Sequence, residues 1–290
     1  MDIHIRHLSY TYHPGTPFEH QVLQNVHLHI AYGHRVALVG RTGAGKSTLV
    51  QHMNGLLKPT QGSVQIGDVT IGSDRRKHPP LYKHVGMVFQ YPEQQLFEET
   101  VFKDVAYGPK NLGWPDEMVE NRVRQALTHV GLEPRYWQQS PFALSGGQKR
   151  RAAIAGILAM QPNILILDEP TAGLDPLGRQ KIMDMLSEWQ AKDKRTLILI
   201  THQMEDVAEY TDEVIVLHEG KLKCQLDPLT LFTEYADQLQ QLGLDIPRWI
   251  ELVSCLNRKL NPPIQLESCK KADVLRQVAC NLRQQRGMNS

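Results

Sequence analysis

The stretch Gly40-Arg41-Thr42-Gly43-Ala44-Gly45-Lys46-Ser47 fits the pattern GxxxxGK[ST] at every position. An apolar run, Arg35 to Val39, precedes it, and a segment compatible with a helix, Ser47 to Asn54, follows it. A glycine-rich turn between a strand and a helix lets backbone N–H groups surround phosphates, and the helix N-terminus adds a positive dipole end. Lys46 supplies a cation for the β- and γ-phosphates, and Ser47 offers a hydroxyl to Mg²⁺. The stretch therefore predicts a phosphate-binding loop.

A second apolar run, Ile164 to Leu167, ends in two carboxylates, Asp168 and Glu169. Ligands of parallel sheets bind at the carboxyl ends of the strands, so both side chains are expected near the phosphates. Asp168 is suited to reach Mg²⁺, directly or through water. Glu169 is suited to orient and deprotonate an attacking water, because the cation favours ionisation of its own ligand and leaves the second carboxylate free to act as a base.

The composition excludes several classes of protein. The chain has 290 residues, of which 41% are hydrophobic, so disorder is not its main state. Its 32 basic and 31 acidic residues give a net charge of +1, which provides no global basic field for nucleic acid. No apolar run approaches the roughly 18 residues of a membrane-spanning helix, and the first residues lack the apolar core of a secretion signal. We expect a cytosolic chain, so that any role at a membrane would come through a partner.

Strands and helices alternate along much of the chain, which implies crossover units and a mainly parallel sheet. Strands are expected at residues 2–8, 22–30, 35–39, 62–71, 84–89, 164–167, 196–200 and 213–217. Helical periodicity characterises residues 99–160, 176–192 and 203–210, and it returns after 221–225, where prolines divide the tail into short helices.

The cysteines and histidines give no sequence signal for a metal or disulfide framework. The four cysteines form no CxxC pair, and we expect them to be reduced core residues. His27 and His29 alternate with apolar residues at the period of a half-buried strand. We therefore expect both to face solvent, and we do not expect a metal site there.

The segment Leu144-Ser145-Gly146-Gly147-Gln148 opens a helix that extends to Met160. By itself it could be an ordinary serine cap with glycines for close packing, or a second anion-binding helix N-terminus. Together with the loop at 40–47 and the acidic pair, it resembles the signature of an ATP-binding cassette (ABC) ATPase. Two phosphate-facing edges in one chain suggest a head-to-tail pair, in which one protomer covers ATP bound by the other.

The resemblance implies the α/β fold of a P-loop NTPase, with a parallel core sheet, an antiparallel β subdomain and a helical subdomain. It covers roughly residues 1–228, with the helical subdomain at about 91–160. Residues 229–290 are then expected to be a C-terminal helical extension. Such a tail buries little surface alone, so we favour a subunit contact over a separate small core as its role.

The resemblance also implies the roles of individual residues, with ATP and Mg²⁺ as cofactors. The residues expected to bind ATP are Tyr12, Gly40, Gly43, Ala44, Gly45, Lys46, Ser47, Thr48, Ser145, Gly146, Gly147 and Gln148. Mg²⁺ is assigned to Ser47, Gln90 and Asp168, and catalysis to Glu169, His202, Lys46 and Gln90. Tyr12 resembles the aromatic residue that stacks on adenine, and Tyr10 is a possible substitute.

The segments 89–101 and 107–112 resemble the energy-coupling factor (ECF) branch of vitamin and metal importers, and most of all the second of its two paired ATPase subunits. This implies a hydrolysing subunit on the cytoplasmic face of the cell membrane. Its expected partners are a second, homologous ATPase, a transmembrane coupling subunit and a substrate-binding membrane subunit, with no nucleic acid. The alternatives are the ATPase of a homodimeric ABC transporter and a soluble, non-transport ABC protein. The sequence does not identify the solute.

Overall fold

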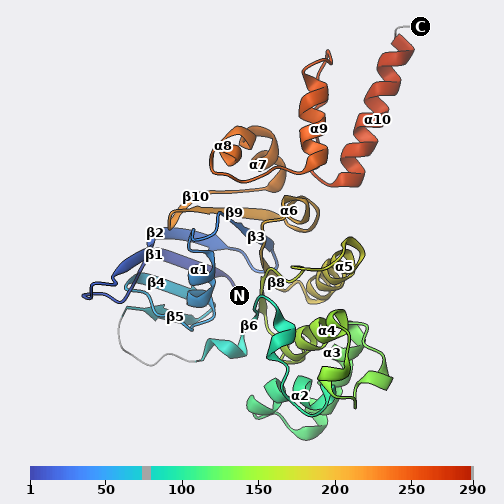
Figure 1. The fold of residues 1–290 in the computed structure, drawn as a ribbon. Coiled ribbons are helices and arrows are strands. Elements are labelled where there is room, and N and C mark those ends of the chain that lie inside the picture. The colour runs from blue at the N-terminus through green and yellow to red at the C-terminus, as the bar shows by residue number, and fades with distance from the viewer. Residues whose placement is uncertain (74–79, 289–290) are drawn as a thin grey trace.

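The computed structural model describes residues 1–73 and 80–288, which form two sheets and surrounding helices (Figure 1). The strands are β1 (Ile3–Tyr12), β2 (His20–Ile30), β3 (Arg35–Val39), β4 (Gln61–Ile66), β5 (Val69–Gly72), β6 (Val85–Val88), β7 (Ile164–Asp168), β8 (Thr196–Ile200), β9 (Glu213–His218) and β10 (Lys221–Leu226). The α-helices are α1 (Lys46–Met53), α2 (Val101–Asn111), α3 (Asp116–His129), α4 (Gly146–Ala159), α5 (Pro176–Asp193), α6 (Met204–Tyr210), α7 (Pro228–Glu234), α8 (Ala236–Gln241), α9 (Arg248–Asn257) and α10 (Lys271–Met288). Short 3₁₀ turns η1–η4 occupy Leu81–Lys83, Pro92–Gln95, Pro134–Tyr136 and Pro141–Ala143.

The larger sheet has the strand order β10-β9-β3-β8-β7-β6. Strands β9, β3, β8, β7 and β6 run parallel, and β10 joins the edge antiparallel to β9. The apolar strands are buried on both faces because Leu165 and Leu167 pack on one side and Ile164 and Ile166 on the other. The predicted parallel sheet is confirmed.

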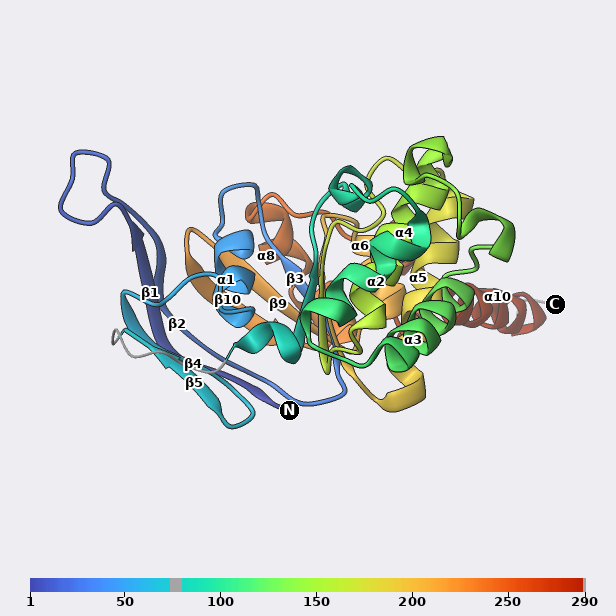
Figure 2. The same cartoon turned by 90° about the horizontal axis from the view of Figure 1, so that it is seen from below.

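The smaller sheet is antiparallel, in the order β2-β1-β4-β5. It packs on the larger sheet through one buried face that includes Ile3, Ile5 and Leu28. Residues 62–71, expected as strand, are two strands, because Gly67 takes a φ of 53° and turns the chain back between β4 and β5. Figure 2 shows this sheet and the helices α2–α4 on opposite sides of the molecule.

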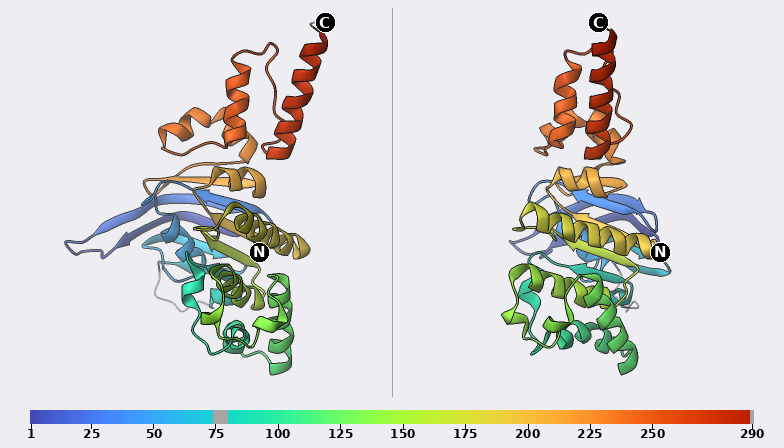
Figure 3. Two further views of the ribbon diagram at one scale, coloured as in Figure 1. Left: turned by 45° about the vertical axis from the view of Figure 1, so that its right-hand side comes forward. Right: turned by 90° about the vertical axis from the view of Figure 1, so that its right-hand side faces the viewer.

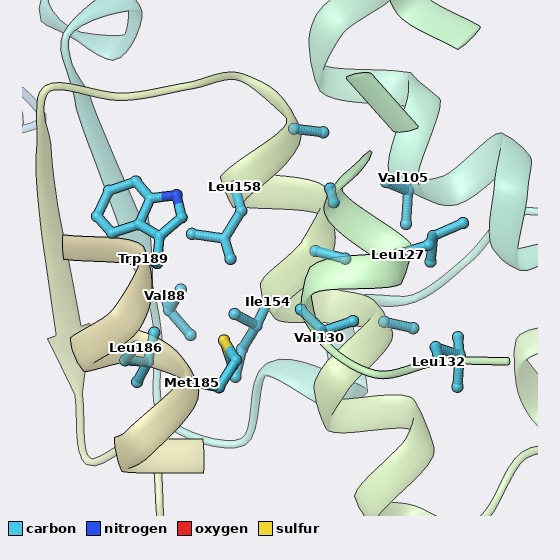
Figure 4. Packing of buried hydrophobic residues seen from close by; sticks show 14 of the residues in the cluster. Val88, Val105, Leu127, Val130, Leu132, Ile154, Leu158, Met185, Leu186 and Trp189 are labelled. Atoms are coloured by element: carbon cyan, nitrogen blue, oxygen red, sulfur yellow. The ribbon is translucent and has the colours of Figure 1, made fainter. Parts of the chain in front are cut away.

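Helices α2, α3 and α4 form a helical subdomain on the other face of the large sheet. Helix α3 buries Val119, Val123 and Leu127, which follow the predicted helical period. In Figure 4, Ile154 and Leu158 of α4 lie between side chains of α5 and of α3. One apolar cluster thus joins the subdomain to the sheet and fixes the position of the helix that begins at the signature segment.

The C-terminal helices share a third apolar cluster with the large sheet. Val214 and Val216 of β9 pack in it with Phe232 of α7, Val253 of α9 and Val274 of α10. The tail is therefore not a separate small core. Helices α9 and α10 nevertheless stand away from the sheets (Figure 3), and Leu252, Leu275 and Leu282 remain exposed on them.

The expected burial of the cysteines is correct only in part. Cys269 is buried and Cys224 is half-buried, but Cys255 and Cys280 are exposed on α9 and α10 because these helices are covered on one side only. All four are free thiols. Among the described residues, no helix has both the length and the apolar character needed to cross a lipid bilayer.

Candidate active site

The phosphate loop connects β3 to α1 at the carboxyl edge of the large sheet. Its three glycines have positive φ angles of 153° at Gly40, 82° at Gly43 and 98° at Gly45, where other residues would be strained. A Cβ at Gly40 would lie 2.3 Å from the Leu217 carbonyl oxygen, so a side chain cannot fit there. Ala44 is buried beneath the loop. The conformation of the loop backbone therefore depends on glycine at these positions.

Lys46 lies inside this loop. Its Nζ donates to the carbonyl oxygens of Gly40 at 2.6 Å and Arg41 at 3.0 Å. Burial lowers the pKa of Lys46, while the nearby carboxylates Glu169 and Asp168 act in the opposite direction. A cation held by neutral carbonyls can transfer its hydrogen bonds to phosphate oxygens, which are stronger acceptors.

The acidic pair lies across from the start of α1. Ser47 Oγ donates to Asp168 Oδ2 at 3.5 Å, although the two residues are 121 positions apart. Burial, followed by the charge of Glu169, raises the pKa of Asp168. A hydroxyl and a partly desolvated carboxylate are the oxygen donors that a hard cation such as Mg²⁺ prefers, so the donor set fits that ion.

Glu169 is the centre of a polar cluster that also contains Gln90 and His202. Gln90 Nε2 donates to Glu169 Oε2 at 3.4 Å, and His202 Nδ1 lies 3.0 Å from Glu169 Oε1. Glu169 has a φ of 48°, a left-handed backbone that turns its side chain away from the line of β7. The ends of β6, β7 and β8 thereby bring together three residues that the sequence assigned to catalysis.

The sequence analysis did not identify the residues that hold His202. Gln203 Nε2, a donor, lies 3.0 Å from His202 Nε2, so Nδ1 carries the proton and donates it to Glu169. Arg179 binds the Gln203 side-chain oxygen at 2.9 Å and the buried carboxylate of Asp206 at 2.9 and 3.0 Å. The orientation of the imidazole therefore depends on an ion pair beneath it.

The two candidate adenine residues lie in different surroundings. Tyr12 Oη is 3.4 Å from Thr48 Oγ1, which places Tyr12 beside the end of the phosphate loop. The Tyr10 ring packs edge-on against the buried His52, with centroids 4.7 Å apart. Both rings lie beside α1 and meet edge-to-face with centroids 4.8 Å apart, but Tyr10 packs against the buried His52 and Tyr12 lies nearer the phosphate loop.

The signature segment begins α4. Ser145 Oγ accepts from Gln148 N at 3.4 Å, and Gln148 Oε1 accepts from Ser145 N at 2.9 Å, which is a reciprocal capping box. A Cβ on Gly146 or Gly147 would meet no atom within 4 Å. These glycines are therefore not required for packing within the described chain, and the backbone they expose is accessible to a ligand.

Arg150 of α4 is a buried charged residue, which the sequence analysis did not identify. It binds both carboxylate oxygens of Glu93 in η2, at 3.0 and 2.8 Å, and the carbonyl oxygen of Ala172 at 2.6 Å. It therefore ties the signature helix to the segments that follow Gln90 and Glu169. Its spacing from Ile154 and Leu158, at four and eight residues, was the sequence signal for burial.

Comparison with known proteins agrees with this geometry. The family model described as "ABC transporter" matches residues 23–172. The energy-coupling factor transporter ATP-binding protein EcfA2 of Bacillus licheniformis is 50% identical over 262 residues, 90% of each chain. The protein of the same name from Clostridium acetobutylicum is 48% identical over 282 residues, covering 95% of this chain and 98% of that protein.

Two solved structures of ABC proteins are also similar to this chain. The cbiO1 protein of Clostridium perfringens, part of the ABC transporter complex cbiONQ, is 38% identical with a TM-score of 0.72 and covers 87% of this chain and 98% of that chain. A dimeric ATP-binding cassette in a post-hydrolysis state with ADP and phosphate is 30% identical with a TM-score of 0.68 and covers 78% of this chain and 98% of that chain.

The chain belongs to the ABC transporter family, and within it to the energy-coupling factor transporter ATP-binding proteins. The predicted fold class and the prediction of an ATP-hydrolysing enzyme are confirmed by this membership. The role of each site residue stays a prediction.

Proposed function

We propose that the chain binds and hydrolyses ATP to power an ECF-type importer, which takes up a vitamin or other micronutrient across the cell membrane. The observation that carries this proposal is the cluster of Glu169 with Gln90 and His202 beside the phosphate loop. These three groups, with Lys46 and Ser47, support the proposal that this chain supplies the base and the phosphate-binding loop for hydrolysis. The names of the ECF relatives support the transport role.

ATP is proposed to bind along α1. The backbone of Gly43 to Thr48 surrounds the phosphates, and Lys46 moves its hydrogen bonds from Gly40 and Arg41 to phosphate oxygens. Tyr12 is the better candidate for stacking on adenine, because it lies beside Thr48 while the Tyr10 ring is engaged by His52.

Ser47, Asp168 and Gln90 are proposed to hold Mg²⁺, which would neutralise phosphate charge when bound. Glu169 accepts a proton from the attacking water, and His202 and Lys46 stabilise charge on the phosphate oxygens. His202 donates a hydrogen bond to Glu169. If the γ-phosphate accepts this hydrogen bond instead, one carboxylate oxygen of Glu169 becomes free to accept from water. Binding of substrate thus prepares the base.

The signature segment is proposed to close over ATP held by a second, homologous ATPase. The exposed backbone at Gly146 and Gly147 and the capped N-terminus of α4 can accept an anion. The dimeric state of a similar cassette supports such a pair. The exposed leucines of α9 and α10 are proposed as a further contact with that subunit.

The tail contact has a direct test. The double variant Leu275→Glu/Leu282→Glu places charge on α10 while leaving the buried Val274 and Val278 in place. We expect weaker association with the second ATPase in size-exclusion chromatography and unchanged ATP affinity. Unaltered association would reject the tail contact without affecting the proposed hydrolysis.

The membrane coupling subunit is proposed to dock in a groove of about 450 Å³ between η1, α2 and α4. Tyr82, Phe97 and Tyr107 line it and are about half exposed, and the rings of Phe97 and Tyr107 meet edge-to-face at 5.0 Å. The groove is lined by residues on both sides of Gln90 in the chain, Tyr82 before it and Gln95 to Phe97 after it, so docking there can be coupled to the catalytic cluster. This contact would hold the chain at the cytoplasmic face of the membrane.

Co-purification from membranes tests the docking groove. We expect Phe97→Glu to reduce capture of membrane subunits by the full chain and to leave ATP binding unchanged. Phe18→Glu is the matched control, because Phe18 is more exposed, at 80%, but lies in the turn between β1 and β2. Equal capture by both variants would exclude the groove.

The same experiment separates the candidate functions. Capture of a similar but non-identical ATPase together with membrane subunits supports the ECF importer. Capture of membrane subunits with identical ATPase chains supports a homodimeric ABC transporter. Recovery without any membrane subunit supports a soluble ABC ATPase. Uptake assays with the captured complex then identify the solute.

A further inference from the structure

The outer face of the antiparallel sheet carries histidines from two strands. His4 of β1 lies directly opposite His29 of β2 in the strand register. Their rings stack with centroids 4.4 Å apart and an angle of 15° between the planes. Their neighbours Ile3, Ile5 and Ile30 point into the core, so the two imidazoles face outward.

Asp2 joins this pair. Its Oδ2 lies 3.1 Å from His29 Nε2, and its Oδ1 accepts from the backbone N–H of Tyr32 at 3.0 Å. The backbone bond holds the carboxylate beside His29. One ligand atom from each of Asp2, His4 and His29 lies within 4.8 Å of the other two.

We propose that Asp2, His4 and His29 form a binding site for a divalent transition-metal ion of the Zn²⁺, Co²⁺ or Ni²⁺ class. Imidazole nitrogen with one carboxylate oxygen is a donor set that these ions favour, whereas Mg²⁺ prefers oxygen alone. The site is therefore chemically different from the one assigned to Mg²⁺ at Ser47 and Asp168. We did not expect a metal at His29 from the sequence, because the alternation within β2 does not show that His4 of β1 lies opposite it.

The geometry requires a small adjustment. A tetrahedral ion with bonds of 2.0–2.1 Å holds its ligand atoms about 3.4 Å apart. Asp2 and His29 already meet this spacing, at 3.1 Å. His4 must turn from its stacked position toward them, because its ligand atom lies within 4.8 Å of the other two but is not yet at that spacing. The remaining coordination positions face solvent and are open to water.

His4 is the residue that distinguishes metal binding from a simple ion pair. Asp2 and His29 would attract each other without a metal, and His4 makes no hydrogen bond to either of them among the contacts of the described residues. A metal site requires His4, whereas the ion pair does not.

The test uses the full chain without nucleotide, Mg²⁺ or a histidine tag. Titration with Co²⁺ is expected to give a visible ligand-field absorption that Zn²⁺ abolishes. We expect His4→Gln and His29→Gln each to weaken Co²⁺ binding at least tenfold, because loss of a ligand costs no less than loss of an outer-shell contact. ATP affinity, which should be unchanged, verifies that each variant is folded.

His27→Gln is the matched control. His27 lies on the same strand and face, and its ring is near His7 at 5.5 Å, but the pair has no third ligand among the described residues. We expect wild-type affinity from this variant. Wild-type Co²⁺ affinity in His4→Gln would overturn the proposal, because the metal would then not depend on His4. An equal loss of Co²⁺ affinity in His27→Gln would also overturn it, because the histidines of this face would then bind metal without a defined site.

A second measurement does not depend on absorption. Asp2 and His4 lie 27 and 25 positions before His29, so a metal that all three share binds the folded state in preference to the unfolded chain. We expect Zn²⁺ to raise the Tm of the wild-type chain and of His27→Gln in a concentration-dependent manner. An equal rise in His4→Gln would contradict the site.

Discussion

The two phosphate-facing edges of the chain differ in how complete they are. At the phosphate loop, Glu169 is already hydrogen-bonded to Gln90 and His202, from the ends of three neighbouring strands. At the signature segment, Ser145 caps its own helix, and a side chain on Gly147 would meet open space. In the proposed mechanism, the first edge holds the base and its polar neighbours in position, whereas the second provides an anion-binding helix N-terminus without a base. In the proposed pair of ATPases, each edge of the chain would therefore supply half of a reaction centre.

The largest expected effect is the loss of ATP turnover when Glu169, at the phosphate-loop edge, is replaced. Glu169→Gln should lower ATP turnover by the assembled transporter about 10²- to 10⁴-fold, because an amide cannot accept a proton from water. ATP binding should persist, and the closed state should accumulate. Release of inorganic phosphate measures the turnover.

Glu219→Gln is a suitable control for that experiment. Glu219 has the same φ of 48° as Glu169 but lies in the exposed turn between β9 and β10. Its variant should keep normal turnover. Full hydrolysis by Glu169→Gln would show that another group is the main base.

Arg150 connects the two edges, so its removal should affect both. Arg150→Ala leaves the half-buried Glu93 carboxylate without its partner and should lower the free energy of unfolding by roughly 3 kcal/mol. Urea denaturation measures this loss. Arg151→Ala, at a more exposed neighbour bonded to the Gly131 carbonyl, should change stability far less. Equal losses in the two variants would mean that the Glu93 contact is not important.

Lys46 tests whether the first edge binds nucleotide on its own. Lys46→Ala should weaken ATP binding roughly 10- to 100-fold, because a charged hydrogen bond to phosphate is lost. Calorimetry on the chain without its partners measures the affinity. Lys223→Ala, on the exposed strand β10, should bind normally. Unchanged affinity in Lys46→Ala would count against the role of the loop.

The smallest effect is expected at Ser145. Ser145→Ala removes a helix cap and should cost about 1 kcal/mol of stability. Thr100→Ala removes the cap of α2, where Thr100 accepts from Lys103 N at 3.2 Å, and should cost a similar amount. Only the Ser145 variant should also lower hydrolysis by the ATPase pair. If both variants hydrolyse ATP equally well, the second edge has no special role.

The parts of the candidate site that could be predicted from the sequence are those formed by short contiguous motifs. The phosphate loop, the acidic pair after β7 and the signature segment each combine a strand or helix boundary with chemistry in fewer than ten positions. The parallel sheet followed from apolar strands alternating with helices. Each of these signals depends on local conformation, which short segments largely determine.

The remaining features depend on contacts between distant residues. Arg150 and Glu93 are 57 positions apart, and Arg179 and Asp206 are 27 apart, so neither ion pair has a sequence signature. Cys269 is buried in the segment before α10, where its Sγ donates to the Ala208 carbonyl oxygen, 61 positions away, whereas Cys280 is exposed on α10. The pairing of His4 with His29 depends on strand register, which the alternation of either strand does not specify.

The third apolar cluster has a consequence for synthesis of the protein. Strand β9 carries Val214 and Val216, but their packing partners Phe232, Val253 and Val274 follow them in the chain. Helix α6 covers part of this surface, but Val214 and Val216 gain their full set of apolar neighbours only when the C-terminal helices have left the ribosome. We expect a chain whose synthesis stops before those helices to expose apolar surface on β9 and to aggregate more readily.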